Sequence, residues 1–514
     1  MSDARLTTVV RVFGALLRGE AGRRLSPGRP RGPGAPLVRQ RERARALRVS
    51  LESLGPFYMK VGQMLATRPD LVSAPVMEEL QRLHDHAAAE PFSAFTSVLE
   101  EELGPRWSRM FAHVRGGQPL GTASLAQVYG ARMLDGREVV IKVQRPGVQA
   151  TVEEDMRLLR RAARLIAYGA PGLTATFDLE ALLGVLFDAM RPELDFTREA
   201  GNMEEARPTV ERFRTLYVPA VVFASPRVLV QSMAPGCSIR DFKRHDLAAD
   251  ERLAIGSDLL ALMHRGYFVD RRFHADPHPG NILIQSDGQA AVIDWGMVGR
   301  IDRRTSAAVL LLMLNLTLND GTGVANAWLE TGRLTTTADP AGFISDITAM
   351  VPQLATATLA ELDFGQTLSA VMRHSARRGI GVNPAVAVLG KSFANIDGSV
   401  RCLAPEVQFT QVIRQHLQAI LLDLAEELLS PAFAGRSALE AMMGLSEAGG
   451  QLRAVANGLS ESGRGGPLQT FLPGGVRPAV RRAALLAVAW AVLRRHSPTA
   501  CRPWPPVQAS PMHR

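Results

Sequence analysis

The stretch at residues 273–284, FHADPHPGNILI, joins a polar loop to an apolar run. Asp276 lies five residues before Asn281 within it. A second acid, Asp294, follows thirteen residues after Asn281 in the sequence VIDWG. Asp and Asn favour turns through local hydrogen bonds, so a loop that merely turns the chain is one interpretation of these residues.

The spacing of these three residues also suits a chemical role. Phosphoryl transfer requires a carboxylate that positions the nucleophile, oxygen ligands for Mg²⁺, and cations on the phosphates. An Asp, an Asn five residues later and a further Asp occur here in the order that protein kinases use. We assign Asp276 as the acid/base or water-positioning group, and Asn281 and Asp294 as metal ligands. The sequence thus predicts ATP and Mg²⁺ as cofactors.

Length and composition indicate a globular protein of two or more domains, with 514 residues and 46% hydrophobic content. The net charge of +9 suits a membrane surface or an anionic ligand. Nucleic acid is not an expected partner, because Trp and Tyr number five each and no nucleic-acid module signature is present. Three scattered cysteines and the absence of a secretory signal predict a cytoplasmic protein.

Lys142 lies inside a predicted strand. Residues 119–147 have the pattern of strand, Asp135-Gly136 turn and strand, and Lys142 is surrounded by Val and Ile in the second strand. A Lys in an apolar strand is costly without an anionic partner. In kinases that partner is a helix Glu together with the ATP phosphates, and the VIK sequence matches the strand that carries this Lys. A surface Lys on an edge strand is the alternative.

Two flanking segments are candidates for the rest of a nucleotide site. The loop before the hairpin has the position of the glycine-rich cover of kinases, although Ala and Ser replace most of its glycines. The sequence RVLVQSMAPG, farther along, has the pattern of a hinge between two lobes, whose backbone would bind adenine. The predicted cofactor-binding residues are therefore Gly121, Thr122, Ala123, Ser124, Lys142, Gln231 and Met233.

A helical segment at residues 41–77 contains LGPFYMKVGQML, in which Lys60 and Gln63 lie on one helix face. This segment, with the motifs above, resembles the Lys-x-Gly-Gln signature of the ABC1 family of atypical kinases, also called UbiB, AarF or ADCK proteins. The resemblance covers residues 40–330 approximately. Gly121 stands where that family usually has Ala, and Trp295 replaces the Phe of Asp-Phe-Gly.

Three acids follow in the sequence PELDFTREAGN. It resembles the family's Glu-x-Asp motif, which implies that Glu193 pairs with Lys142 as a catalytic residue. The same resemblance implies that Asp195 and Glu199 contact the helix of Lys60 and Gln63, which lies across the site as a regulatory element. An ordinary acidic surface is the alternative interpretation.

The resemblance implies an α+β, two-lobed protein-kinase-like fold. The expected divisions are a basic amphipathic segment and linker (1–37), a helical extension (38–117), an N-lobe (118–235), a C-lobe with added helices (236–448) and a linker with a short basic apolar helix (449–514). The resemblance also implies a membrane-associated ATPase or small-molecule kinase that assists isoprenoid quinone or other lipid biosynthesis. A nucleotide-binding scaffold is the main alternative. A protein kinase is disfavoured because no Ala-Pro-Glu segment follows Asp294, and an aminoglycoside-type phosphotransferase would lack the Lys60 helix.

The chain ends predict surface association more than a membrane span. Residues 5–18 form an amphipathic pattern, and an Arg-flanked apolar stretch at 483–493 is too short for the twenty residues or so that a span needs. Pro-, Gly- and Ser-rich linkers are expected at 26–36 and 449–475. The prediction is a cytoplasmic protein, peripheral at the inner face of the cell membrane, with anionic lipid or an isoprenoid quinone precursor as partner and a homodimer allowed. The last 200 residues, mostly helical, carry no expected chemistry.

Overall fold

The computed structural model describes residues 7–8, 11–12, 35–66, 72–80, 82–83, 89–169, 183–184, 187–188, 190–355, 364–407 and 420–426. The chain divides into two compact units, residues 1–412 and 413–514, and every element named below belongs to the first. The predicted C-terminal helix at 483–493 and the linker at 449–475 lie outside the described residues. So does most of the linker at 26–36, and only four residues of the predicted N-terminal helix are described, as helical.

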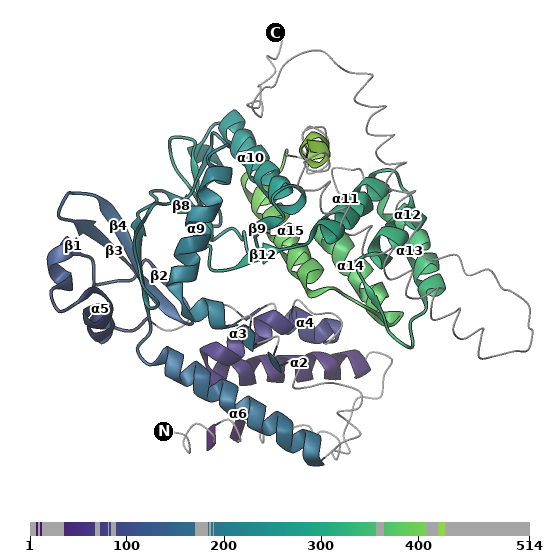
Figure 1. Ribbon diagram of the computed structural model, residues 1–514, viewed down its shortest axis with the longest axis horizontal. Coiled ribbons are helices and arrows are strands. Elements are labelled where there is room, and N and C mark those ends of the chain that lie inside the picture. Colours follow the sequence, from purple (N-terminus) through teal and green to yellow (C-terminus); the bar gives the residue numbers. More distant parts are fainter. Residues whose placement is uncertain are drawn as a thin grey trace, which may run out of the picture. The chain divides into compact units, whose positions relative to one another are not determined.

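An antiparallel sheet forms the first layer of this unit (Figure 1). Its order is β1-β3-β4-β7-β6, and β2 pairs with β3. The sheet begins before residue 118, because residues 111–114 form a strand and not the helix that was predicted there. The strands are β1 (Phe111–Val114), β2 (Gly121–Thr122), β3 (Ala126–Met133), β4 (Glu138–Gln144), β6 (Val221–Ala224) and β7 (Val228–Ser232).

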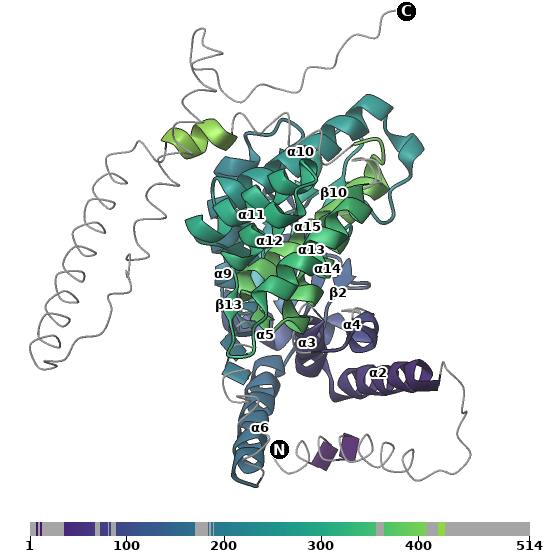
Figure 2. The ribbon, with the colours of Figure 1, turned by 90° about the vertical axis from the view of Figure 1, so that its right-hand side faces the viewer.

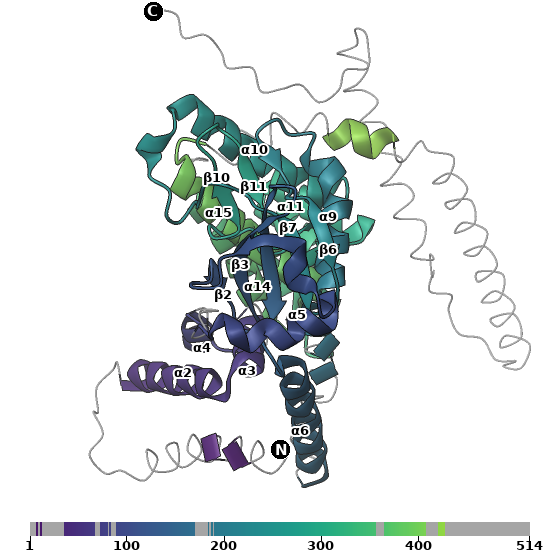
Figure 3. The ribbon, with the colours of Figure 1, turned by 90° about the vertical axis from the view of Figure 1, so that its left-hand side faces the viewer.

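Strands β3 and β4 form the predicted hairpin around the Asp135-Gly136 turn. Side chains alternate between the two faces of a strand. Val139, Ile141 and Val143 therefore point to one face, where they pack with helix α5 (Thr96–Leu103) in an apolar core. Figure 3 shows α5 lying against the strands. Lys142 points to the opposite face, toward the rest of the molecule.

The second layer contains a four-stranded sheet of order β5-β11-β10-β8, with residues Leu216–Tyr217, Ala290–Val292, Ile282–Ile284 and Cys237–Ser238. A two-stranded sheet pairs β9 (Arg272–His274) with β12 (Val298–Arg300), and another pairs β13 (Arg333–Leu334) with β14 (Ile380–Gly381). The catalytic-loop candidate at 275–281 thus runs from β9 to β10. Residues 233–236 connect β7 of the first sheet to β8 of the second, which is the place of a hinge.

Helices make up most of the remaining structure (Figures 1 and 2). Within the part of the chain that the structure describes, none has an apolar stretch long enough to cross a membrane. Together with the sheets they give the predicted α+β class. Their bounds are α2 (Ala35–Leu54), α3 (Pro56–Leu65), α4 (Ala74–Leu80), α6 (Val148–Gly169), α9 (Phe196–Val210), α10 (Ala249–Phe268), α11 (Arg303–Thr317), α12 (Gly321–Leu329), α13 (Pro340–Ala355), α14 (Phe364–Arg377) and α15 (Pro384–Leu403). The described residues also include the 3₁₀ turns η1 (Phe92–Phe95), η2 (Trp107–Met110), η3 (Arg191–Leu194) and η4 (Arg244–Asp246).

Gly236 in the connecting segment gives a stability prediction. Its φ is 100°, and a Cβ there would clash with the carbonyl oxygen of Ile284. Gly136 in the hairpin turn has a φ of 86° and open space around the same position. We expect Gly136→Ala to lose about 1–2 kcal/mol of unfolding free energy from the left-handed backbone alone. Gly236→Ala should lose more, because the backbone must also move; equal losses in urea denaturation would contradict this account.

Candidate active site

Lys142 is the centre of a charge cluster between the two layers. Its Nζ lies 2.9 and 2.8 Å from the two carboxylate oxygens of Glu199. It also donates to Oδ1 of Asp294 at 3.2 Å. The ring of Phe196 lies alongside, with its centroid 5.2 Å from Nζ. The strand Lys, a helix Glu and the Asp of VIDWG therefore meet at one point, from segments far apart in the sequence.

The cluster has one cation and two carboxylates, and this balance shifts all three pKa values. Burial alone would lower the pKa of Lys142, but Asp294 and Glu199 together raise it above its ordinary value. Burial raises the pKa of Glu199 to about 7, against the opposing effect of Lys142. Lys142 holds the pKa of Asp294 well below its usual range. The side chain of Asp294 is 48% exposed, so a further cation can approach its carboxylate.

The predicted pairing of Glu193 with Lys142 is wrong, because Glu199 makes that contact. Helix α9 begins at Phe196, so Phe196, Glu199, Ala200 and Met203 form its buried stripe. Glu199 is the acid on this stripe, and it needs a buried cation. The spacing of i, i+3, i+4 and i+7 was visible in the sequence. This spacing identifies Glu199 as the partner of Lys142 only once the first residue of α9 is known, because that residue decides which acid belongs to the helix.

Glu193 instead binds the helical extension. It lies in η3, ahead of α9, and its Oε1 is 2.9 Å from Nζ of Lys60 on α3. The predicted contacts of Asp195 and Glu199 with this extension differ as well, because Glu199 binds Lys142. Asp195 caps α9 by accepting hydrogen bonds from the backbone N–H and hydroxyl of Thr197, at 3.0 and 2.6 Å. Gln63 donates to the carbonyl of Leu83 at 3.1 Å, which connects α3 to the chain after α4.

Hydrogen bonds shape the loop that carries Asp276. The N–H of Asp276 donates to Nδ1 of His274 at 3.1 Å, so Nδ1 carries no proton and Nε2 donates to the carbonyl of Ile293 at 3.1 Å. Burial lowers the pKa of His274, which keeps this ring neutral. Asn281 Nδ2 donates to the carbonyl of Asp276 at 3.0 Å. The loop is thus closed on itself, with its Asp and Asn held in fixed positions.

Asn281 and Asp294 are brought together by the backbone. The N–H of Ile293 donates to the carbonyl of Asn281 at 2.9 Å, which sets Asp294 one residue beyond this link. Asp294 has a φ of 57°, a left-handed conformation that Asp tolerates better than most residues. Both side chains carry the hard oxygen donors that Mg²⁺ prefers. Among the described residues, no group of three or more His, Cys, Asp or Glu side chains could hold a metal ion. A Mg²⁺ ion bound to substrate phosphates does not need such a group, because one or two carboxylates suffice.

The predicted phosphate loop lies in one row with Lys142. Gly121 pairs with Val128, and Val128 pairs with Lys142 on the next strand, so the loop is two strands away from the ammonium group. The N–H of Ala123 donates to the carbonyl of Ala126 at 2.8 Å, and Ser124 is buried. At the hinge, Gln231 pairs with Val140 in the sheet, and the N–H of Met233 donates to the backbone carbonyl of Glu138 at 3.0 Å.

Two residues near Asp276 were missed in the sequence. Lys391 Nζ lies 3.0 Å from Oδ2 of Asp276, and Asn395 Nδ2 lies 2.5 Å from Oδ1. Both come from α15, a helix in the region that was expected to carry no chemistry. Burial would raise the pKa of Asp276, but Lys391 and His278 outweigh it and hold the pKa below its ordinary value. The spacing of Lys391 and Asn395 at i and i+4 in GKSFANIDG was the available signal.

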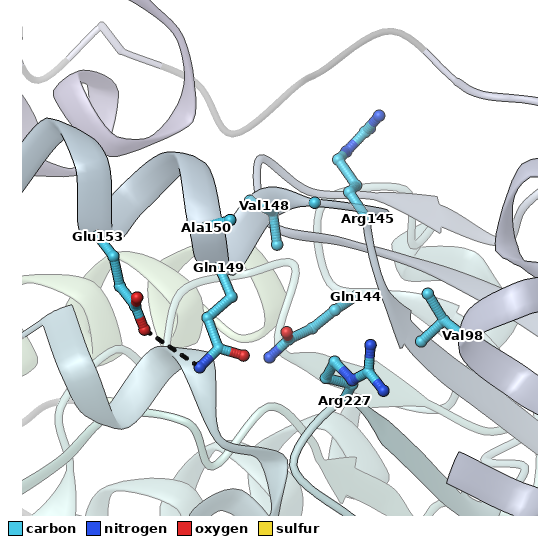
Figure 4. A pocket seen from close by; sticks show the side chains of 9 residues that line it. Val98, Gln144, Arg145, Val148, Gln149, Ala150, Glu153 and Arg227 are labelled. Atoms are coloured by element: carbon cyan, nitrogen blue, oxygen red, sulfur yellow. Dashed lines mark hydrogen bonds between the residues drawn. The ribbon is translucent and has the colours of Figure 1, made fainter. Parts of the chain in front are cut away.

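A pocket on the α5 side of the first sheet is separate from this cluster (Figure 4). Gln144, Arg145 and Arg227 line it together with the first turn of α6. Two of these side chains have acidic partners: Arg145 is 2.6 Å from Glu90, and Arg227 binds the two acids at the end of α5. None of the predicted nucleotide or metal residues lines the pocket.

Comparison with known proteins agrees with this geometry. The family model of the ABC1 atypical kinase-like domain matches residues 82–328. A probable protein kinase UbiB of Azotobacter vinelandii is 32% identical over 394 residues, which are 74% of this chain and 71% of the relative. Its namesake in Xylella fastidiosa strain 9a5c is 30% identical over 396 residues, 74% and 70% of the two chains.

A solved structure shows the same fold. The complex of Rv3197 with erythromycin from Mycobacterium tuberculosis superposes with a TM-score of 0.51 at 22% sequence identity. The match covers 74% of this chain and 96% of that one. From the family model, the curated relatives and the kinase-like arrangement around Lys142, we conclude that this chain belongs to the ABC1 (UbiB) family of atypical kinases.

Proposed function

We propose that this chain is an Mg²⁺-dependent ATPase or small-molecule kinase that works at a membrane surface. The observation that carries the proposal is the contact of Lys142 with both Glu199 and Asp294. A kinase needs this Lys–Glu ion pair and the metal-binding Asp in place at the same time. A structural ion pair alone would not require a second carboxylate with an exposed face.

Each residue of the cluster has a proposed role in nucleotide binding. Lys142 would contact the phosphates, with Glu199 as the partner that orients it. Asn281 and Asp294 would hold Mg²⁺, which bridges phosphate oxygens and neutralises their charge when bound. The loop of Gly121 to Ser124 would cover the phosphates, and the hinge backbone beyond Gln231 would contact adenine. These roles follow from position in the fold and from the chemistry of the side chains.

Asp276 would act on the attacking oxygen. With water as acceptor, the oxygen bonds to the γ-phosphorus while the bond from that phosphorus to the β,γ-bridging oxygen breaks, and ADP leaves with the electron pair. Asp276 accepts a proton from the water and returns it to solvent after product release. Its lowered pKa keeps Asp276 ionised at neutral pH, so that the carboxylate can orient the water by accepting its hydrogen bond.

Surface charge supports the membrane part of the proposal. Exposed arginines follow one another along α6, and others lie on α2. Both helices contribute to one apolar cluster. Basic side chains near a surface attract anionic lipid. These residues are Arg157, Arg160, Arg161 and Arg164 on α6, and Arg41, Arg43 and Arg45 on α2.

We propose a lipid precursor, for example of an isoprenoid quinone, as the object of the reaction. The name UbiB of the relatives points toward this pathway. The location would be the inner face of the cell membrane, where the protein is peripheral. The ion pair of Lys60 with Glu193 attaches the helical extension to the segment just ahead of α9. An extension that lies across the site would obstruct a protein substrate, which supports an acceptor other than a protein.

A nucleotide-binding scaffold without turnover is the second candidate, and one experiment separates the two. The purified protein is assayed for phosphate release from Mg·ATP with anionic vesicles, with neutral phosphatidylcholine vesicles, and without lipid. We expect anionic vesicles alone to raise the rate. Nucleotide binding with no turnover under all three conditions would favour the scaffold.

A further inference from the structure

Helix α15 contacts the catalytic loop with four side chains. Lys391 and Asn395 bind the carboxylate of Asp276. Ser392 donates its hydroxyl to the carbonyl of His274 at 2.7 Å, and Ser399 donates to the carbonyl of Pro277 at 2.9 Å. Positions i, i+1, i+4 and i+8 of a helix point to one side. One face of α15 therefore follows the loop from before Asp276 to after it.

The loop has no Lys or Arg of its own that could take this place. The sequence HADPHPGN holds neither Lys nor Arg. Its second histidine, His278, accepts the N–H of Gly280 through Nδ1 at 2.9 Å, which commits that nitrogen to the loop. A carboxylate that must hold an attacking oxygen needs both of its own oxygens fixed in space. Here both are fixed from α15, and one of the two contacts is a charge pair.

We propose that Lys391 and Asn395 are the positioning residues of Asp276, and that the functional kinase-like unit extends through α15. This inference rests on the proposed phosphoryl-transfer function. It places two required side chains well beyond residue 328, where the family model match ends. Lys391 holds one oxygen of Asp276 and Asn395 the other, which fixes the orientation of the carboxylate.

A role in positioning differs measurably from a role in anchoring the helix. Substitution of a residue that only anchors the helix would lower stability, nucleotide affinity and turnover together. A positioning residue affects the rate constant of the chemical step and leaves nucleotide affinity nearly unchanged, because it does not touch the nucleotide residues Lys142, Asn281 and Asp294. Misplacement of a reacting group by a small distance can cost roughly 100-fold in rate.

The test compares Lys391→Met, Lys391→Arg and Arg401→Gln in the full-length protein. Met removes the charge at similar length, and Arg retains it. Arg401→Gln is the matched control, because Arg401 lies on the same helix and pairs with Asp397 at 2.7 Å, whereas Asp276 is bound by Lys391 and Asn395. For each variant, kcat, KM for ATP and ADP affinity are measured. Hydrogen exchange of the peptide 273–284 is followed by mass spectrometry.

We expect Lys391→Met to lower kcat by roughly 100-fold with ADP affinity nearly unchanged. Lys391→Arg should recover a large part of the loss, and Arg401→Gln should stay within about twofold of wild type. Exchange of the loop peptide should rise in Lys391→Met and not in the control. Asn395→Ala should act in the same direction as Lys391→Met, with a smaller effect because no charge is lost.

Several results would overturn the inference. A kcat for Lys391→Met at or above that of wild type would show that the contact is dispensable or restrains the site. Equal losses of kcat, nucleotide affinity and thermal stability would show a helix anchor. If wild type itself has no turnover, the proposed function fails, and the inference is then decided by hydrogen exchange: unchanged protection of the loop in Lys391→Met would refute it.

Discussion

Asp294→Asn is expected to lower Mg²⁺-dependent ATP turnover by roughly 100-fold or more, because it removes a charged ligand at the point where transition-state charge is stabilised. The fold should persist, since Asn also tolerates the left-handed backbone at this position. The substitution also removes the charge that Lys142 contacts at 3.2 Å. Turnover measured across a Mg²⁺ series should show a weaker apparent metal affinity together with a lower maximal rate.

Asp287→Asn is the matched control for this prediction. Asp287 is exposed in the turn between β10 and β11, where it accepts a hydrogen bond from the N–H of Gln289. The Asp287→Asn substitution removes the same charge from the same part of the chain and leaves Lys142 and the loop at 275–281 unchanged. A rate for Asp294→Asn equal to that of Asp287→Asn would rule out Asp294 as a metal ligand in a working site.

The second large effect concerns the partner of Lys142. Glu199→Gln keeps the size of the side chain and removes the buried charge that Lys142 binds with both oxygens. We expect turnover to fall by roughly 100-fold, because Lys142 is then held only by Asp294 and no longer oriented toward the phosphates. Steady-state kinetics and nucleotide affinity, measured side by side, would separate lost chemistry from lost binding.

Glu193→Gln provides the comparison, because the same change is made six residues earlier on a different partner. It breaks the 2.9 Å ion pair with Lys60 and leaves the contacts of Lys142 with Glu199 and Asp294 in place. Its effect on turnover should therefore be much smaller than that of Glu199→Gln. If Glu193→Gln proved the more damaging of the two, the sequence-based pairing of Glu193 with Lys142 would stand and the assignment to Glu199 would fall.

Glu193 and Glu199 show which features of the site could be predicted from the sequence and which could not. The spacing of Asp276, Asn281 and Asp294 is local, and the strand character of Lys142 follows from alternation, so both were predictable along with the α+β fold. The partner of Lys142 depends on where α9 begins. Asp195 caps that helix, and the cap decides that Glu199 and not Glu193 lies on the buried face.

Contacts between distant segments were harder to predict for the same physical reason. Lys391 and Asn395 follow Asp276 by more than a hundred residues, and nothing local in α15 requires them to meet its carboxylate. Their i, i+4 spacing states only that they share a helix face. Which face points to the loop depends on how α15 packs against its neighbours α10 and α14.

Catalysis at this site is tested most directly by phosphate release from Mg·ATP by wild type and Asp276→Asn, with nucleotide affinity measured on the same samples. Asp276 lies outside the Lys142 cluster, so its substitution should leave binding intact while the carboxylate that orients the nucleophile is lost. We predict Mg²⁺-dependent release by wild type and its near-complete loss in Asp276→Asn at unchanged affinity. Equal rates for the two proteins would contradict catalysis at this site.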